Sequence, residues 1–248
     1  EKTARHLFCI FIHCIRALTD FCNFLVTVII FIPECCPQMA TNETDNKNTG
    51  EKTVEGSIVK ALFSRPQLLL FSVGTFLVAF SYKQISFVLP IQLNMMFTDD
   101  GARIYGIVAA LNAISVIFLN PVVLNISKKN NTLKNILFAV VIYTIAFFLF
   151  GIARIPWQFF SLTLLYTIGE MLLNNNSKAY QNNNTPVNFR GRFNAILPLF
   201  KTTGTMIAPI IGGIIMEINS YVAVWILAGS FALITYFIYW YIYQKYEK

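Results

Sequence analysis

Charged side chains are scarce in this sequence: aspartate, glutamate, lysine and arginine together make up 12% of its 248 residues. Soluble domains carry about 25% charged residues, because their surfaces must stay hydrated. So few charges do not cover a soluble globule of this length, which excludes that class. Apolar residues instead make up 56% of the chain, and its mean hydropathy is +0.58. The composition therefore predicts a protein with several membrane-spanning segments.

Motifs of metal sites and enzymes are also missing. The five cysteines and both histidines fall near the start of the chain, between positions 6 and 36. None of their spacings is that of a zinc site. The chain has no G-x-x-x-x-G-K-[ST] loop for nucleotide phosphates, no H-E-x-x-H and no G-x-S-x-G. We therefore expect no metal, no cofactor, no enzymatic activity and no ATP-driven step in this chain.

Long apolar runs dominate what is present. A helix needs about 20 apolar residues to span the roughly 30 Å hydrocarbon core of a bilayer. Such runs predict an all-α membrane protein, a polytopic helical bundle. The runs of suitable length are residues 7–32, 67–97, 104–126, 133–153, 157–178, 193–216 and 221–243.

The first run, 7–32, is the weakest of these. Arg16 and Asp20 interrupt it, although a spacing of four lets them pair on one helix face. A secretory signal peptide is the alternative, but charge breaks its apolar region and no small-residue cleavage site follows. Residues 34–65 contain few apolar side chains and predict a flexible linker before the other runs.

Positive charge alternates between the loops. Arg103 and Arg154 lie in loops on one side, whereas the linker, every second loop after it and the C-terminus hold twelve lysines and arginines. Because cytoplasmic loops are enriched in lysine and arginine, we expect the linker and the C-terminus to be cytoplasmic in a multi-pass protein of the cell (plasma) membrane. The net charge of +7 then follows from topology, and no nucleic-acid partner is needed. The residues on the expected cytoplasmic side are Lys47, Lys52, Lys60, Arg65, Lys128, Lys129, Lys134, Lys178, Arg190, Arg192, Lys245 and Lys248.

Five stretches resemble a known transporter family. Residues 184–213, NTPVNFRGRFNAILPLFKTTGTMIAPIIGG, combine a proline-containing loop, R-G-R-[FY] and a helix ending in G/A-P-x-x-G-G. Residues 166–180 (YTIGEMLLNNNSKAY), 82–93 (YKQISFVLPIQL), 105–121 (YGIVAALNAISVIFLNP) and 31–37 (FIPECCP) precede it in the family's order. Together they resemble the C-terminal half of a major facilitator superfamily (MFS) transporter, in the branch of drug-efflux-like exporters.

The resemblance covers about residues 24–244. Residues 1–23 match nothing in it, and the polar run 174–177 stands where the family has prolines or glycines in its tenth helix. The fold that it implies is a six-helix C-terminal half with one helix before it. The implied regions are 1–33, the last helix of an N-terminal half; 34–65, a cytoplasmic central linker; and 66–248, the six-helix half.

The resemblance also implies an activity. We expect secondary active transport, as proton-coupled efflux of small amphipathic compounds, with the proton gradient as the energy source. The expected partners are the small-molecule cargo, the lipid bilayer and a six-helix N-terminal half, either upstream in the same chain or in a second chain. Two alternatives stay open: a truncated or half-size protein that does not transport alone, and an uptake transporter on the same fold.

Ionisable residues inside the apolar runs are candidate functional residues, because each costs about 2.5–3.5 kcal/mol at the centre of a spanning helix. Glu170 lies roughly 20 Å along its run, and Lys83 lies at comparable depth. Desolvation favours the neutral form of a carboxyl group, so we expect Glu170 to couple transport to protons or cations, with Lys83 as its partner. A purely structural ion pair between them is the alternative. Lys201 is a weaker candidate, since it can snorkel to the headgroups.

Uncharged polar side chains in the runs are candidates for cargo contact. They are Gln84, Asn112 and Asn120. The alternative for all three is hydrogen bonding between helices. Phe80, Tyr82 and Phe87 are aromatic candidates for lining a cavity for apolar cargo, with lipid contact as the alternative.

The last motif concerns movement and packing. The resemblance implies a cytoplasmic gating loop at Arg190, Gly191 and Arg192, whose guanidinium groups can hold carbonyl groups, acids or lipid phosphates. Gly191 would permit a tight turn between them, and simple anchoring at the membrane face is the alternative. Small residues in the next helix predict close packing and points of bending, at Gly204, Pro209, Gly212 and Gly213.

Overall fold

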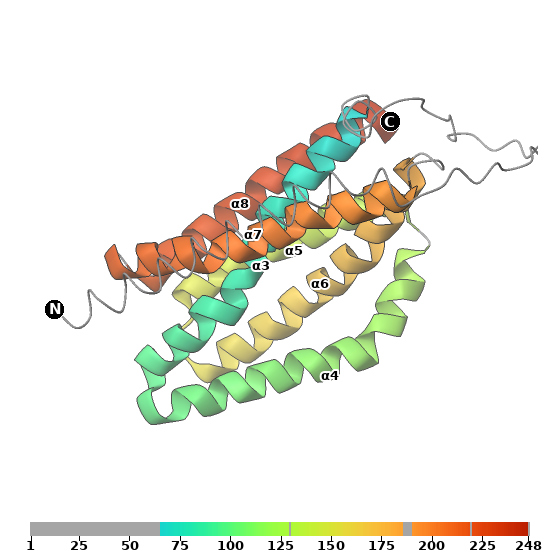
Figure 1. Cartoon of the computed structure of the whole chain (residues 1–248). Coiled ribbons are helices and arrows are strands. Elements are labelled where there is room, and N and C mark those ends of the chain that lie inside the picture. Colours follow the sequence, from blue (N-terminus) through green and yellow to red (C-terminus); the bar gives the residue numbers. More distant parts are fainter. Residues whose placement is uncertain (1–64, 129, 186–189, 219, 248) are drawn as a thin grey trace, which may run out of the picture. The chain divides into compact units, whose positions relative to one another are not determined.

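The computed structural model describes residues 65–128, 130–185, 190–218 and 220–247 (Figure 1). All of them belong to one compact unit of the chain, Gly50–Lys248. The expected helix in 1–33 and the linker up to residue 64 lie outside the described residues.

Every regular element in the described part of the chain is helical, which confirms the all-α prediction. A 3₁₀ turn, Thr98–Asp100, joins the first two helices, and a π-helical turn, Tyr243–Glu247, follows the last. The α-helices are α3 Pro66–Phe97, α4 Gly101–Ser127, α5 Thr132–Ile152, α6 Pro156–Asn184, α7 Arg190–Ile218 and α8 Tyr221–Ile242.

Local chemistry explains where three of these helices begin. Pro66 and Pro156 open α3 and α6, in the first turn where a missing backbone N–H costs no hydrogen bond. Asn131 caps α5, and its side-chain oxygen accepts a hydrogen bond from the Leu133 amide at 2.8 Å. Each of these helices begins within a few residues of the first residue of its apolar run.

Helix α6 differs most from its predicted extent, since it continues from residue 178 to Asn184. Its asparagines find partners on other helices, which removes the cost of polar groups in an apolar bundle. Asn175 donates to the Asn120 side-chain oxygen on α4 at 2.8 Å, and Asn176 accepts from Asn135 on α5 at 3.1 Å. Asn184 accepts from Gln67 at the start of α3 at 3.0 Å.

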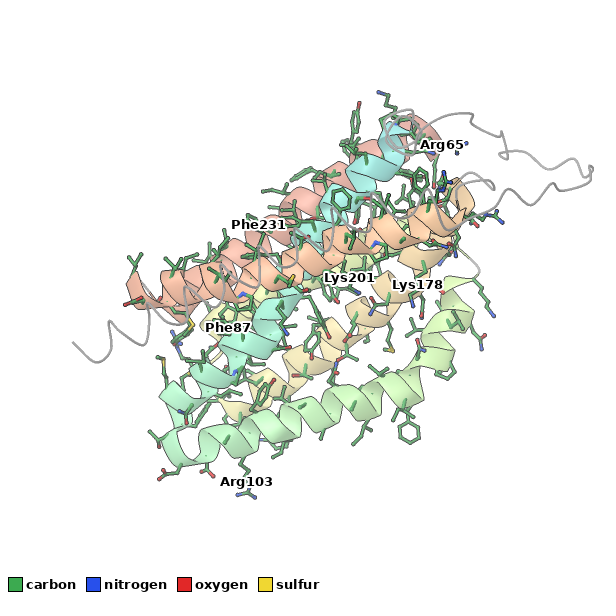
Figure 2. All side chains as sticks on the ribbon, in the orientation of Figure 1. Arg65, Phe87, Arg103, Lys178, Lys201 and Phe231 are labelled. Atoms are coloured by element: carbon green, nitrogen blue, oxygen red, sulfur yellow. The ribbon has the colours of Figure 1, made fainter. Side chains whose placement is uncertain are left out.

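The helices pack in a closed circuit (Figure 1). Helix α8 lies between α3 and α5, α6 packs against α5 and α4, and α4 returns to α3. Helix α7 packs mainly against α3. Arg65 and Arg103 lie at opposite ends of the bundle, as Figure 2 shows.

The core between α3, α5 and α8 is aromatic. The rings of Phe150 and Trp225 stack at 5.0 Å between centroids, and both side chains are fully buried. The Trp225 indole donates to the Gln92 side-chain oxygen at 2.7 Å, and the Gln92 amide donates to the Phe150 carbonyl at 3.0 Å. One buried glutamine therefore joins three helices while leaving no polar atom of its side chain unpaired.

Small residues of α7 lie where it approaches α3. A Cβ atom added to Gly204 would collide with the backbone carbonyl oxygen of Phe76, and one on Gly212 would lie 2.6 Å from the Gln84 side chain. Gly213 is less crowded, with Phe87 at 3.8 Å, and Pro209 lies within a helix that continues past it. The crossing of α7 over α3 therefore depends on the missing side chains of Gly204 and Gly212.

Length and apolarity qualify four helical stretches of the described residues to cross a membrane. They are Pro66–Ser127, which includes both α3 and α4, Thr132–Ile152, Arg190–Ile218 and Tyr221–Glu247. Helix α6 does not reach the same apolarity, because it carries Glu170 and the asparagines described above. It is the helix whose polar side chains build the site below.

Candidate functional site

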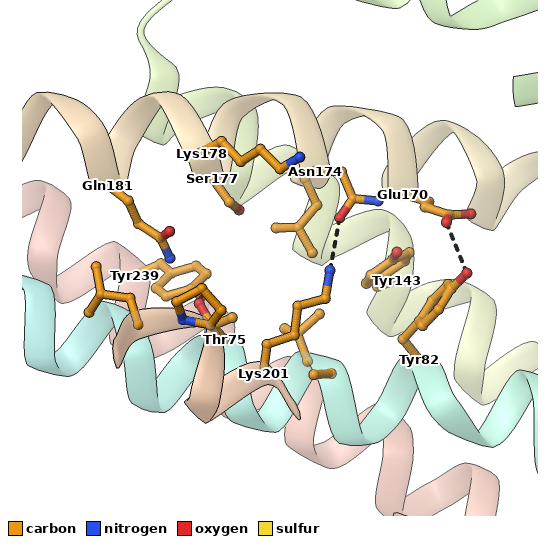
Figure 3. A pocket seen from close by; sticks show the side chains of 15 residues that line it. Thr75, Tyr82, Tyr143, Glu170, Asn174, Ser177, Lys178, Gln181, Lys201 and Tyr239 are labelled. Atoms are coloured by element: carbon orange, nitrogen blue, oxygen red, sulfur yellow. Dashed lines mark hydrogen bonds between the residues drawn. The ribbon is translucent and has the colours of Figure 1, made fainter. Parts of the chain in front are cut away.

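A cavity of about 460 Å³ lies between α3, α6 and α7, with α5 and α8 behind it (Figure 3). Its apolar wall includes Val78, Leu173 and Leu197. Helix α6 supplies half of its polar side chains, tyrosines and one threonine come from α3, α5 and α8, and Lys201 comes from α7. The polar and charged lining residues are Thr75, Tyr82, Tyr143, Glu170, Asn174, Ser177, Lys178, Gln181, Lys201 and Tyr239.

Glu170 lies in the wall of this cavity, and its carboxylate is held by neutral donors. The Tyr82 hydroxyl donates to one oxygen at 2.9 Å, and the Asn112 amide donates to the other at 3.2 Å. Asn112 also donates to the Thr167 hydroxyl at 2.9 Å, which fixes the orientation of its amide. In the described residues no lysine or arginine forms an ion pair with Glu170. The carboxylate therefore keeps its hydrogen bonds but not a fixed counter-charge.

The structure contradicts the expected pairing of Lys83 with Glu170. Successive residues of an α-helix point about 100° apart. Tyr82 faces Glu170, so its neighbour Lys83 faces elsewhere, and Lys83 does not line the cavity. Similar depth along two helices therefore did not bring the two charges together.

The three amide candidates for cargo contact make hydrogen bonds between helices. Gln84 donates to the Ala208 carbonyl on α7 at 2.9 Å, and Asn120 accepts from Asn175 on α6. Asn112 touches Glu170 directly. None of the three lines the cavity. In this structure all three therefore occupy positions that fit the alternative, hydrogen bonding between helices.

The RGR segment forms the first turn of α7. Arg190 and Gly191 are exposed, and Arg192 is half-buried. Gly191 is helical, and a Cβ atom added to it would meet nothing within 4 Å. The expected tight turn at Gly191 is therefore wrong, because the chain there is already an ordinary helix.

Several cavity residues were not among the predicted site residues. Lys178 was expected only among the basic residues of the cytoplasmic side, and Asn174 belonged only to an unusual polar run. A signal for this face was present: Glu170, Asn174, Ser177 and Gln181 follow one another at spacings of four, three and four. Such spacing places all four on one side of a helix. The stripe predicts a polar face on α6, whereas its partner helices come only from the fold.

The long apolar helices of this chain are those of a multi-pass membrane protein. Comparison with known proteins agrees with this class. A model of the Major Facilitator Superfamily matches residues 21–194. The chain belongs to this superfamily.

Two relatives are similar to this chain. One is a "Na(+), Li(+), K(+)/H(+) antiporter" of Planococcus maritimus, 24% identical over 196 residues, which cover 73% of this chain and 45% of the relative. The other is the "Uncharacterized MFS-type transporter YqjV" of Bacillus subtilis, strain 168, 24% identical over 147 residues, or 59% of this chain and 36% of that one. The chain thus spans less than half the length of the curated relatives it matches.

Proposed function

We propose that this chain is the C-terminal half of a secondary transporter that exchanges protons for small amphipathic compounds, exporting them across the plasma membrane. The cavity supports this, because its volume of about 460 Å³ lies in the range of small-molecule sites. Its wall also combines apolar side chains with a few charged and hydroxyl groups, which suits amphipathic cargo. The assignment to the drug-efflux branch of the superfamily rests on the motifs that resemble it.

The observation that carries the proposal is the carboxyl group of Glu170, which borders the cavity and is held only by neutral donors. As a carboxylate it accepts from Tyr82 and Asn112. As a neutral acid its O–H can donate to the Tyr82 oxygen, because a phenol hydroxyl both donates and accepts. The same side chains therefore satisfy both protonation states. A proton taken up from one side of the membrane can be released on the other.

The proposal includes a second, N-terminal half. The relatives are more than twice as long as the segment they share with this chain. Helices α4 and α7 leave apolar side chains exposed, among them Ile117, Phe118 and Ile214. We assign part of this surface to the missing half and part to lipid. The two halves would then rock about the cavity, in the manner of transporters built from repeated halves.

The test uses the full-length protein in liposomes that contain a pH-sensitive dye. With Glu170→Gln, we expect proton movement coupled to the cargo to fall to the level of empty liposomes, because the amide does not bind a proton. Cargo binding should persist. The control is Glu217→Gln, which changes an exposed acid of α7 away from the cavity. Coupled proton movement that survives in Glu170→Gln would refute the proton role.

The same liposomes separate the alternatives. Reconstitution of the 248-residue chain alone tests whether this half transports without its partner, and reversing the gradient distinguishes efflux from uptake. The name of the Planococcus relative favours a second candidate, exchange of monovalent cations for protons. Proton movement driven by Na⁺ or K⁺, with no amphipathic compound present, would select that candidate. Lys178 and Lys201 in the same cavity oppose it, since they repel a bare cation.

A further inference from the structure

Two lysines line the cavity from facing helices. Lys178 comes from α6 and Lys201 from α7, and Figure 3 shows both among the side chains that line the cavity. Glu170 is two helical turns before Lys178, roughly 12 Å along the axis. The cavity therefore has an acidic end and a basic end, with the apolar side chains of Val78 and Leu173 among its walls.

Neither lysine has an acidic partner in the part of the chain that the structure describes. The Lys201 ammonium donates to the Asn174 side-chain oxygen at 3.4 Å, a long and neutral hydrogen bond. No hydrogen bond or ion pair joins Lys178 to another described residue. The carboxylate in the same cavity, Glu170, is already held by Tyr82 and Asn112. Two positive charges thus face one cavity without a counter-ion from the described helices.

The surrounding groups suit an anion. Ser177 and Gln181 line the same stretch of α6 and can each donate a hydrogen bond beside the ammonium groups. Hydrogen bonds between a charged donor and an anionic oxygen are about twice as strong as neutral ones. The apolar wall leaves room for a hydrocarbon body next to such a head. A lysine pair that only snorkelled to the headgroups would not need this arrangement.

We propose that Lys178 and Lys201 bind the anionic head of the ligand, a carboxylate, sulfonate or phosphate, while its apolar body lies against Val78, Leu173 and Leu197. This inference rests on the proposed function, and it narrows the cargo from amphipathic compounds in general to amphipathic anions and zwitterions. The head can belong to a free amphiphile or to a lipid, which share this chemistry. Binding at the lysines does not require a proton step at Glu170.

The test is equilibrium binding to the purified full-length protein in a neutral detergent. Three probes share one apolar body and differ in the head: octanoate, octanamide and octyltrimethylammonium. The variants are Lys178→Gln, Lys201→Gln and the double variant, with Lys201→Arg to retain the charge. Lys245→Gln is the matched control, because Lys245 is exposed at the C-terminus and does not line the cavity. Thermal unfolding of each variant shows whether it is folded.

We expect the unchanged protein to bind octanoate at least about tenfold more tightly than octanamide, since charge-assisted hydrogen bonds contribute that much. The folded double variant should lose this preference while keeping its affinity for octanamide. Lys201→Arg and Lys245→Gln should retain it. A preference for octanoate that survives in the double variant, or a stronger binding of octyltrimethylammonium to the unchanged protein, would overturn the proposal.

Vesicles distinguish the source of the anion. The protein is reconstituted in phosphatidylcholine with or without phosphatidylglycerol, and octanoate binding is measured again. If phosphatidylglycerol displaces octanoate only when the lysines are present, the site takes a lipid headgroup and its assignment to cargo is wrong. If octanoate binding is unchanged by the lipid, the cargo assignment stands. Glu170→Gln separates this inference from the proposed function: loss of proton coupling with lysine-dependent binding intact supports both, whereas surviving coupling with intact binding removes only the proton role.

Discussion

Two groups of helices in this protein are held in different ways. Eleven of the 21 residues of α5 are buried, and α8 packs on both α5 and α3 through large aromatic side chains. In contrast, five of 27 residues of α4 and five of 29 residues of α7 are buried. Helix α4 is joined to α6 by asparagine hydrogen bonds, and α7 meets α3 at two glycines. We call α5 and α8 the packed helices, and α4 and α7 the border helices.

The difference shows what packing adds in a membrane protein. All four helices are apolar, yet the packed helices bury a larger share of their residues against protein than the border helices do. Lipid chains are about as apolar as leucine, so apolarity alone does not drive one helix against another. Association depends instead on shape and on hydrogen bonds. The border helices bury fewer residues, and under the proposed function these are the helices that we expect to change neighbours when the two halves rock.

The largest effect is expected from the packed helices. Trp225→Ala removes a fully buried indole and its hydrogen bond to Gln92, and should lower the free energy of unfolding by about 3–5 kcal/mol. Trp240→Ala on the same helix is the control, because Trp240 is 46% exposed and should cost less than about 1 kcal/mol. Thermal or denaturant unfolding in detergent measures both. Equal losses would show that α8 is not held by its buried aromatic core.

A smaller effect is expected at the crossing of α7 and α3. Gly204→Ala places a methyl group against the Phe76 backbone, and should cost about 1–3 kcal/mol. Gly213→Ala is the control, since its new methyl would meet only Phe87, at 3.8 Å, and should change stability by less than about 0.5 kcal/mol. The same unfolding measurement applies. If both substitutions are neutral, α7 does not depend on close backbone contact and the contrast with α8 fails.

The smallest effect is expected where α4 joins α6. Asn175→Ala and Asn120→Ala remove the two partners of one hydrogen bond, and the coupling between them in a double-mutant cycle should be about 0.6 kcal/mol. Such a small value is typical of polar contacts within membranes. Asn182→Ala, at an exposed position of α6, serves as the control. A coupling of several kcal/mol would mean that α4 is held as firmly as the packed helices.

Much of the fold could be predicted because a bilayer imposes a length on each helix. The run 133–153 corresponds to α5, Thr132–Ile152, and the run 221–243 to α8. Helix α6 was predicted too short, because its asparagines look like a polar loop until their partners on α3, α4 and α5 are known. Hydropathy measures each residue alone, whereas a buried amide is stable only when a second helix supplies its hydrogen bond.

The candidate site divides in the same way. Glu170 could be identified from its charge within an apolar run, and it does border the cavity. Its partner was predicted one residue away from the observed one, at Lys83 in place of Tyr82. Lys201 was a weaker candidate and Lys178 was assigned only to the cytoplasmic side, although both line the cavity. A rotation of 100° per residue separates a side chain that faces the cavity from one that does not.

Composition, run length and motif order were therefore sufficient for the class, for the superfamily and for the described helices apart from the end of α6, because membrane solvation acts on each helix separately. Scarce charge, the feature that first set this chain apart, also marked Glu170 as unusual. The meeting of Glu170 with Tyr82 and Asn112, and of Lys178 and Lys201 across the cavity, depends on how each helix is rotated and on which neighbour it packs against. Those choices arise from contacts between residues more than twenty positions apart, so they appear only in the folded bundle.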